Sequence, residues 1–221
     1  MTPSSPRQNR VDPWSRLVAT PERGLLFGNR GSLHDDKGRI VRAYQVTRWI
    51  ICVLDFKGRK RAIMQPGHYT ELFFLDEATA LAAGHRPCAE CQRARYELFL
   101  GFWVKTQGTI GRPRANDVDA VLHAARWANG RKLTYRARLG DLPAGTIVAP
   151  LDDDTPYLVW ERQLYQWDFA GYQAGLSYDA DAEMRVLTPK PIVDILAAGY
   201  PVLLHPSLAH SVSSLESGHS S

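Results

Sequence analysis

The 221-residue sequence has few cysteines and no long apolar run, and both shortages narrow the class of protein. Three cysteines cannot close a disulfide framework of the kind that stabilises small secreted domains. No stretch approaches 18 uncharged apolar residues, which argues against a membrane-spanning helix. Residues 1–10 lack the apolar segment of a secretory signal. We therefore expect a reduced, cytoplasmic protein with no membrane partner.

The sequence also lacks the common signatures of nucleotide binding and of an activated serine. It contains no P-loop, no glycine-rich dinucleotide fingerprint and no nucleophile elbow. We therefore expect no nucleotide cofactor, and whether the protein is an enzyme stays open. The composition, with 44% hydrophobic and 23% charged residues, is that of a globular protein with one large domain or two small ones.

Charge is divided unevenly along the chain. Residues 1–115 contain 19 Lys and Arg against 10 Asp and Glu, a balance of +9. Residues 116–221 contain 8 against 13, a balance of −5. A basic half attracts polyanions such as DNA or RNA, because binding releases their counterions. The alternative is that the two halves face each other and complement each other's charge.

The pattern of elements predicts an α+β fold with two modules between two tails. Residues 1–13 and the Ser-rich residues 209–221 show no periodicity, and we expect a flexible tail at the first and disorder at the second. Residues 14–113 predict a basic, zinc-knuckle-like module made of a hairpin and two helices. Residues 114–208 predict an acidic, β-rich module that is closed by a helix.

Local signals place the elements of the first module. The β-branched and aromatic run at 49–56 predicts a strand, and residues 61–64 are predicted to return as its hairpin partner. Asp76 is the expected N-cap of an Ala-rich helix that ends at Gly84. A second helix is predicted to begin near Cys91, because apolar residues recur there at three- and four-residue spacing.

The second module shows weaker patterns. Residues 118–128 predict a helix, and residues 157–160 and 163–167 predict a hairpin with a two-residue turn. Residues 191–198 predict the closing helix. Short strands at this spacing are typical of a small β-sheet.

The most specific chemical motif is the pair Cys88-Ala89-Glu90-Cys91. Two thiols one turn apart, after a proline and before a helix, are typical of a zinc knuckle. Structural zinc needs four ligands, and Cys52 and His68 are the best remaining candidates. The sequence alone also allows two partly buried free thiols, or a redox pair.

Residues 72–91 resemble the end of the zinc-binding domain of the Ada-type adaptive-response proteins, which repair methyl phosphotriesters in DNA. The shared pattern is an aromatic strand, an Ala-rich helix, Ala-Ala-Gly, and then Arg-Pro-Cys followed by two residues and Cys. By this resemblance, Cys88 and Cys91 take the place of the family's last two zinc ligands. The chain as a whole also resembles a family of bacterial proteins of unassigned function, which adds no expectation.

The resemblance has one large gap. The Ada family places a second cysteine pair upstream, and one of those cysteines accepts the methyl group. In this chain the corresponding residues, about 57–68, include no cysteine. We therefore expect no methyl-acceptor activity, and we expect Cys52 or His68 to complete any metal site.

A basic cluster follows the predicted strand at 49–56. It places four positive charges within five residues: Lys57, Arg59, Lys60 and Arg61. Such side chains contact phosphates, although a solvated turn has the same composition. Four nearby aromatic residues either stack on bases or belong to the core: Trp49, Tyr69, Phe73 and Phe74.

Two other functions remain as alternatives. Asp36, Asp55 and Lys57 have the order of a metal-dependent nuclease or similar hydrolase, in which the carboxylates hold Mg²⁺ and the lysine positions a water. A protein–protein adaptor that uses the acidic half is the second alternative. The leading hypothesis is a cytoplasmic protein that binds one structural zinc ion and contacts nucleic acid through its basic module. The sequence does not indicate an oligomeric state.

Overall fold

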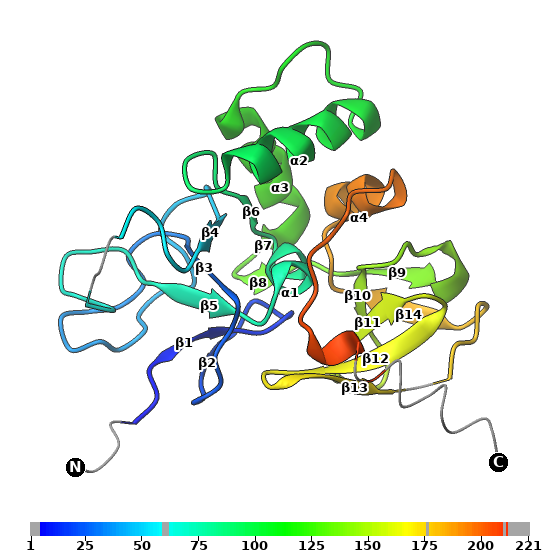
Figure 1. Cartoon of the computed structure of the whole chain (residues 1–221), viewed down its shortest axis with the longest axis horizontal. Coiled ribbons are helices and arrows are strands. Elements are labelled where there is room, and N and C mark those ends of the chain that lie inside the picture. Colours follow the sequence, from blue (N-terminus) through cyan, green and yellow to red (C-terminus); the bar gives the residue numbers. More distant parts are fainter. Residues whose placement is uncertain (1–4, 59–61, 176, 210, 212–221) are drawn as a thin grey trace.

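The computed structural model describes residues 5–58, 62–175, 177–209 and 211 (Figure 1). As expected, the protein is α+β. The described residues form two six-stranded sheets, one two-stranded ribbon, four α-helices and one 3₁₀ turn. None of these helices has the length and apolar character that crossing a bilayer requires.

The first sheet is mixed and comes from the first 87 residues. Its strands are β1 (Gln8–Val11), β2 (Leu17–Ala19), β3 (Leu26–Asn29), β4 (Ile50–Val53), β5 (Leu72–Phe74) and β6 (Arg86–Pro87). Their spatial order is β2-β1-β5-β3-β4-β6. β1 and β5 run parallel, as do β4 and β6, while the remaining neighbours are antiparallel.

Two expectations for this region are wrong. The strand predicted at 49–56 is present as the shorter β4, but its partners are β3 and β6 instead of residues 62–64, while residue 61 lies outside the described residues. Within that segment Ile63 and Met64 lie in a turn, and the positive φ of Met64, 57°, is incompatible with a strand. The tail expected at 1–13 is also ordered in part, because β1 buries Val11 completely.

Two helices are present near the end of the first sheet as predicted, one between β5 and β6 and one after β6. α1 (Glu77–Ala82) begins at Asp76, whose carboxylate accepts a hydrogen bond from the Thr79 N–H at 2.9 Å. The chain leaves this helix through Gly84, where φ is +87°. α2 (Arg93–Thr106) buries the four apolar residues whose spacing predicted it: Tyr96, Phe99, Leu100 and Trp103.

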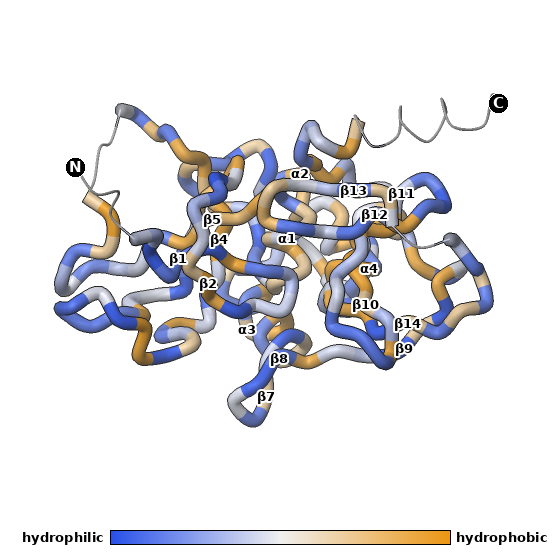
Figure 2. Tube along the Cα trace, turned by 90° about the horizontal axis from the view of Figure 1, so that it is seen from below, coloured by the Kyte–Doolittle hydropathy of each residue, from blue (hydrophilic) through white to orange (hydrophobic). Residues whose placement is uncertain are grey.

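The central part of the chain forms a helix and a small ribbon. α3 (Ala115–Arg126) confirms the predicted helix, although it begins and ends earlier than expected. It leads directly into the ribbon of β7 (Trp127–Ala128) and β8 (Arg131–Lys132). Figure 2 shows this ribbon protruding from the body of the molecule with a hydrophilic tip.

The second sheet is antiparallel throughout. Its strands are β9 (Tyr135–Arg138), β10 (Ile147–Ala149), β11 (Tyr157–Trp160), β12 (Gln163–Asp168), β13 (Gly171–Ala174) and β14 (Glu183–Val186), in the order β13-β12-β11-β10-β14-β9. The 3₁₀ turn η1 (Leu139–Asp141) follows β9. The predicted hairpin is confirmed as β11–β12, and both residues of its turn, Glu161 and Arg162, have positive φ.

The two predicted modules share a core. α4 (Lys190–Ala197), the predicted closing helix, places Ile192, Ile195 and Leu196 among buried residues of the first sheet and α2. Figure 1 shows α1 in the middle of the molecule, between the two sheets, and α4 above the second sheet, beside α2 and α3. The predicted boundary at 113/114 therefore separates the two sheets, but it does not separate their packing.

Candidate metal centre

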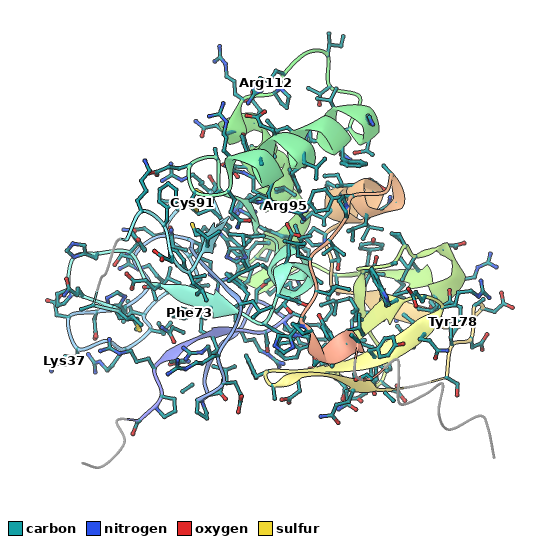
Figure 3. All side chains as sticks on the ribbon, viewed as in Figure 1. Lys37, Phe73, Cys91, Arg95, Arg112 and Tyr178 are labelled. Carbon is teal, nitrogen blue, oxygen red and sulfur yellow. The ribbon has the colours of Figure 1, made fainter. Side chains whose placement is uncertain are left out.

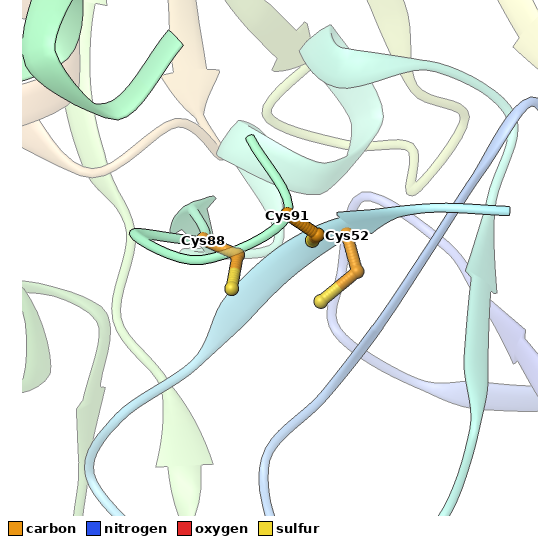
Figure 4. A group of neighbouring side chains, drawn as sticks. All are labelled: Cys52, Cys88 and Cys91. Atoms are coloured by element: carbon orange, nitrogen blue, oxygen red, sulfur yellow. The ribbon is translucent and has the colours of Figure 1, made fainter. Parts of the chain in front are cut away.

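The three cysteines of the sequence converge at one edge of the first sheet. Cys52 lies on β4, while Cys88 and Cys91 lie in the turn between β6 and α2 (Figure 4). Their sulfur atoms all lie within 4.8 Å of one another. The structure thus joins Cys52 to the predicted knuckle across a sequence separation of 36 residues.

The parallel pairing of β4 with β6 explains how Cys52 reaches the knuckle. Ile51 of β4 is the register partner of Pro87 of β6. Because the two strands are parallel, the next residue of each, Cys52 and Cys88, lies beside the other. The Cys88 N–H donates to the Ile51 carbonyl at 2.9 Å, and the Gln92 side chain donates to the same oxygen at 3.0 Å. These bonds fix the knuckle against β4.

The knuckle directs a backbone donor at sulfur. The Glu90 N–H lies 3.4 Å from the Cys88 Sγ, and the Gln92 N–H closes the turn by donating to the Cys88 carbonyl at 3.1 Å. N–H groups aimed at a sulfur stabilise its thiolate form. Hydrogen bonds from the Cys52 and Cys91 thiols and from backbone N–H groups lower the pKa of Cys88. The hydrogen bond between Cys52 and Cys88 raises the pKa of Cys52.

The sulfur spacing fits a zinc ion. A tetrahedral site with Zn–S bonds of about 2.3 Å separates its sulfur atoms by about 3.8 Å. The observed separations are no more than 4.8 Å, so they exceed that value by about 1 Å at most. Thiolate ligands also favour zinc over the harder Mg²⁺ and Ca²⁺ ions, which take oxygen ligands. The donor set therefore suits a soft metal with three protein ligands.

His68, the other predicted ligand, lies elsewhere. It is exposed, and its Nδ1 is 3.1 Å from the Pro66 carbonyl. Among the described residues, the three cysteines are the only group of three or more Cys, His, Asp or Glu side chains whose ligand atoms lie this close together. The described residues therefore supply three ligands, which leaves a fourth position open to a further ligand such as a water molecule or a group from a bound partner.

The cysteines form part of the wall of a cavity of about 430 Å³. Four aromatic residues line the same cavity: Phe27, Phe56, Tyr69 and Phe73. Figure 3 labels Cys91 and Phe73 on this part of the molecule. Sequence reasoning missed Phe27, which reaches the site because it is the register partner of Cys52 in the β3–β4 pair. No local pattern reveals that pairing.

Charged side chains of both signs lie at this aromatic cavity. Arg48, Glu71 and Glu90 line it directly. The Lys57 Nζ lies 5.1 Å from the centre of the Phe56 ring, and the Arg10 guanidinium lies 4.8 Å from the centre of the Phe73 ring. The other members of the predicted basic cluster, Arg59, Lys60 and Arg61, fall outside the described residues. Arg48, Lys57 and Arg10 thus place positive charge near the rings, against the two carboxylates of the lining.

The predicted aromatic residues divide into two groups. Tyr69 and Phe73 line the cavity, so they are available to a ligand. Trp49 and Phe74 are completely buried and belong to the protein interior.

The residues of the nuclease alternative are exposed. Asp36, Asp55 and Lys57 all lie on the surface, and Asp36 occupies the turn closed by the bridge between His34 and Ile40. Neither carboxylate belongs to the one group of close metal-ligating side chains found within the described ranges. The geometry therefore adds nothing to that alternative.

Comparisons with protein families, with curated proteins and with solved structures find no significant match. The functional interpretation therefore depends on the geometry of the site.

Proposed function

We propose that this protein binds one zinc ion through Cys52, Cys88 and Cys91 and contacts nucleic acid with the cavity beside that ion. The observation that carries the proposal is the convergence of three thiol side chains, from β4 and the knuckle, within 4.8 Å in the cavity wall. When bound, zinc would supply a structural cross-link between the sheet and the start of α2. The Glu90 N–H and the hydrogen bonds to Ile51 orient the knuckle for that role.

The cavity lining supports a nucleic-acid ligand. Aromatic rings beside cations bind single-stranded nucleic acid, because bases stack on the rings while phosphates pair with the cations. Lys57 and Arg10 lie over two rings that line this cavity, Phe56 and Phe73, while Glu71 and Glu90 are the opposing carboxylates of the lining. The balance of +9 in residues 1–115 favours the same class of partner.

The resemblance to the Ada-type domain supports the proposed ion in a limited way. The matching residues 72–91 span β5, α1, β6 and the knuckle, the elements that position Cys88 and Cys91. We propose that the resemblance reflects this zinc-binding framework, and that the protein has no methyl-acceptor activity.

The metal half of the proposal is tested by metal analysis of the purified protein. We expect about one zinc per wild-type chain and a loss of at least tenfold in zinc affinity in Cys52→Ser and Cys88→Ser, because each removes one of three thiolates. His68→Ala is the matched control and should retain its zinc, since His68 lies outside the cysteine group. Metal-free wild-type protein after purification under reducing conditions, with no uptake of added zinc, would contradict the proposal.

The nucleic-acid half is tested with a labelled single-stranded oligonucleotide by fluorescence anisotropy. We expect the affinity to fall with rising salt and Phe56→Ala to weaken binding about tenfold, because it removes a stacking surface. Arg48→Gln should weaken binding and reduce the salt dependence by about one counterion.

Arg136→Gln is the control for these variants, since Arg136 is exposed on β9 of the second sheet. If Phe56→Ala and Arg48→Gln bind as tightly as the wild type, the proposed face is wrong. If the wild type binds no oligonucleotide at low salt, the nucleic-acid half fails and the adaptor hypothesis replaces it.

A further inference from the structure

A second cavity, of about 360 Å³, lies apart from the metal centre. Four segments that are separate in the sequence form it: β1 and β2 with their connection, Arg30 directly after β3, residues 40–43, and the β7–β8 ribbon. Among the described residues, none lines both cavities. The inference drawn from it is therefore independent of the proposed zinc site.

The lining of this second cavity carries charge of one sign. Five positive side chains line it: Arg16, Arg30, Arg42, Arg131 and Lys132. No Asp or Glu occurs among the described residues that line it. Arg16, Arg42 and Arg131 are exposed, whereas Arg30 is only 1% exposed. The cavity thus has positive residues both at the surface and in the interior.

Arg30 is a buried cation with unused donors. Its guanidinium lies 4.5 Å from the centre of the Trp49 ring, and its Nη2 donates to the Ser15 carbonyl at 2.9 Å. Its Nε and Nη1 have no hydrogen-bond partner within the described part of the chain. Buried polar groups are almost always hydrogen-bonded in native proteins, so two free donors on one guanidinium call for a ligand.

Two further cations raise the local positive charge. The Arg126 guanidinium lies 4.2 Å from the centre of the same Trp49 ring, and the Lys132 Nζ donates to the Ala82 carbonyl at 2.6 Å. Burial, together with the charges of Arg126 and Arg30, lowers the pKa of Lys132 to about 7 despite the opposing effect of Asp12. Burial likewise lowers the pKa of Arg30 to about 9.

The neighbouring carboxylates balance only part of this charge, because Asp12 pairs with Arg16 and Asp119 pairs with an arginine outside the cavity. Asp12 accepts from the Arg16 Nε at 2.6 Å through one oxygen and from the Arg16 N–H at 2.9 Å through the other. Asp119 pairs through both oxygens with Arg86, at 2.9 and 2.7 Å. An excess of buried positive charge is unfavourable unless an anion enters.

We propose that this cavity binds a phosphate group, with Arg30 as the buried donor and with Arg42 and Arg131 contacting it from the surface. A phosphate offers several acceptor oxygens, which matches guanidinium groups that converge from separate segments. Trp14 and Trp127 line the same cavity, so an organic group attached to the phosphate would lie on aromatic surface. The ligand class is a phosphate monoester or inorganic phosphate.

The experiment is an isothermal titration of the full-length protein with sodium phosphate, in which NaCl keeps the ionic strength constant. We expect one site, with binding weakened about tenfold in Arg42→Gln and in Arg131→Gln, because each removes one charge-assisted hydrogen bond. These two residues are exposed, so the variants should fold normally. Arg138→Gln, exposed on β9, is the matched control and should bind as the wild type does.

Two further arms distinguish the sources of the phosphate. If adenosine monophosphate binds at least tenfold more tightly than inorganic phosphate, the monoester is the ligand. If a 5′-phosphorylated oligonucleotide binds at least tenfold more tightly than its 5′-hydroxyl form, and phosphate competes with it, the ligand is a nucleic-acid end. Absence of phosphate binding, or equal binding by wild type, Arg42→Gln and Arg131→Gln, would overturn the proposal.

Discussion

His85 is a neutral ring held among buried arginines. It is completely buried, 5.1 Å from the ring centre of Trp49 and 4.7 Å from that of Phe74. Within the residues that the structure describes, neither ring nitrogen has a hydrogen-bond partner. Burial, followed by the charges of Arg30 and Arg126, lowers the pKa of His85 well below its usual value.

This environment makes stability depend on pH. The unfolded chain binds a proton at His85 below about pH 6.5, whereas the folded protein does not, so the free energy of unfolding should fall as the pH decreases below that value. Urea unfolding of wild type and His85→Phe between pH 7 and 5 measures the effect. We expect the wild type to lose up to about 1.4 kcal/mol per pH unit more than the variant.

His68→Ala is the control for this comparison, because His68 is exposed and should not contribute. Identical pH profiles for wild type and His85→Phe would contradict the assignment of a neutral, buried His85.

The individual candidate ligands were only partly predictable from the sequence. The Cys88–Cys91 pair has a local signature, since a proline and a helix flank it. Choosing between Cys52 and His68 required the β4–β6 pairing, a contact between residues 36 positions apart. The burial of Arg30 could not be predicted from the sequence, because it depends on Trp49 and the β7–β8 ribbon, which are distant in the sequence and pack around it.

At the scale of elements, the short helix α1 connects the two sheets through its N-cap. One Asp76 oxygen accepts from the N–H and the hydroxyl of Thr79, at 2.9 and 2.7 Å. The other accepts from the Tyr172 hydroxyl at 2.8 Å and from the His205 N–H at 3.0 Å. Tyr172 lies on β13 of the second sheet, so a single carboxylate links elements that are far apart in the sequence.

We expect Asp76→Ala to lower the free energy of unfolding by about 3 kcal/mol, because it removes an N-cap and leaves several buried donors without an acceptor. Asp76→Asn retains an acceptor for Thr79 and should lose less. Urea denaturation of the three proteins tests this order. If Asp76→Ala lowers the free energy of unfolding by less than about 1 kcal/mol, the Asp76 carboxylate does not stabilise the packing between the two sheets.

Elements with local signals were predictable, and long-range pairings were not. α1, α2 and the β11–β12 hairpin follow from capping residues, helical spacing and a two-residue turn. β3 was missed, although Gly28 within it has a structural reason: a Cβ there would lie 2.0 Å from the Ile50 carbonyl oxygen of the neighbouring strand. β1 was missed because its residues are mostly polar: one partner, β2, is close in the sequence, and the other, β5, lies about 60 positions away.

At the scale of the whole molecule, the shared core predicts a single unfolding unit. Ile195 of α4 is completely buried in the same cluster as Val11 of β1 and Phe99 of α2. We expect Ile195→Ala to lower the free energy of unfolding by about 2–5 kcal/mol and to destabilise both sheets together. Denaturation followed in parallel by tryptophan fluorescence and by far-ultraviolet circular dichroism tests this.

Val121→Ala is the control, because Val121 is 46% exposed on α3 and its truncation should change stability by less than about 0.5 kcal/mol. Two separate transitions in Ile195→Ala would show instead that the sheets unfold independently.

The order of the elements along the chain also has a consequence during synthesis. Because the ribosome makes the chain from its N-terminus, β1 to β6 emerge before α2, α3 and α4, which supply buried residues of the same cluster. The buried side of the first sheet therefore stays incompletely covered until α4, about 100 residues after β6, has been made. It is during this interval that a chaperone would have most to protect.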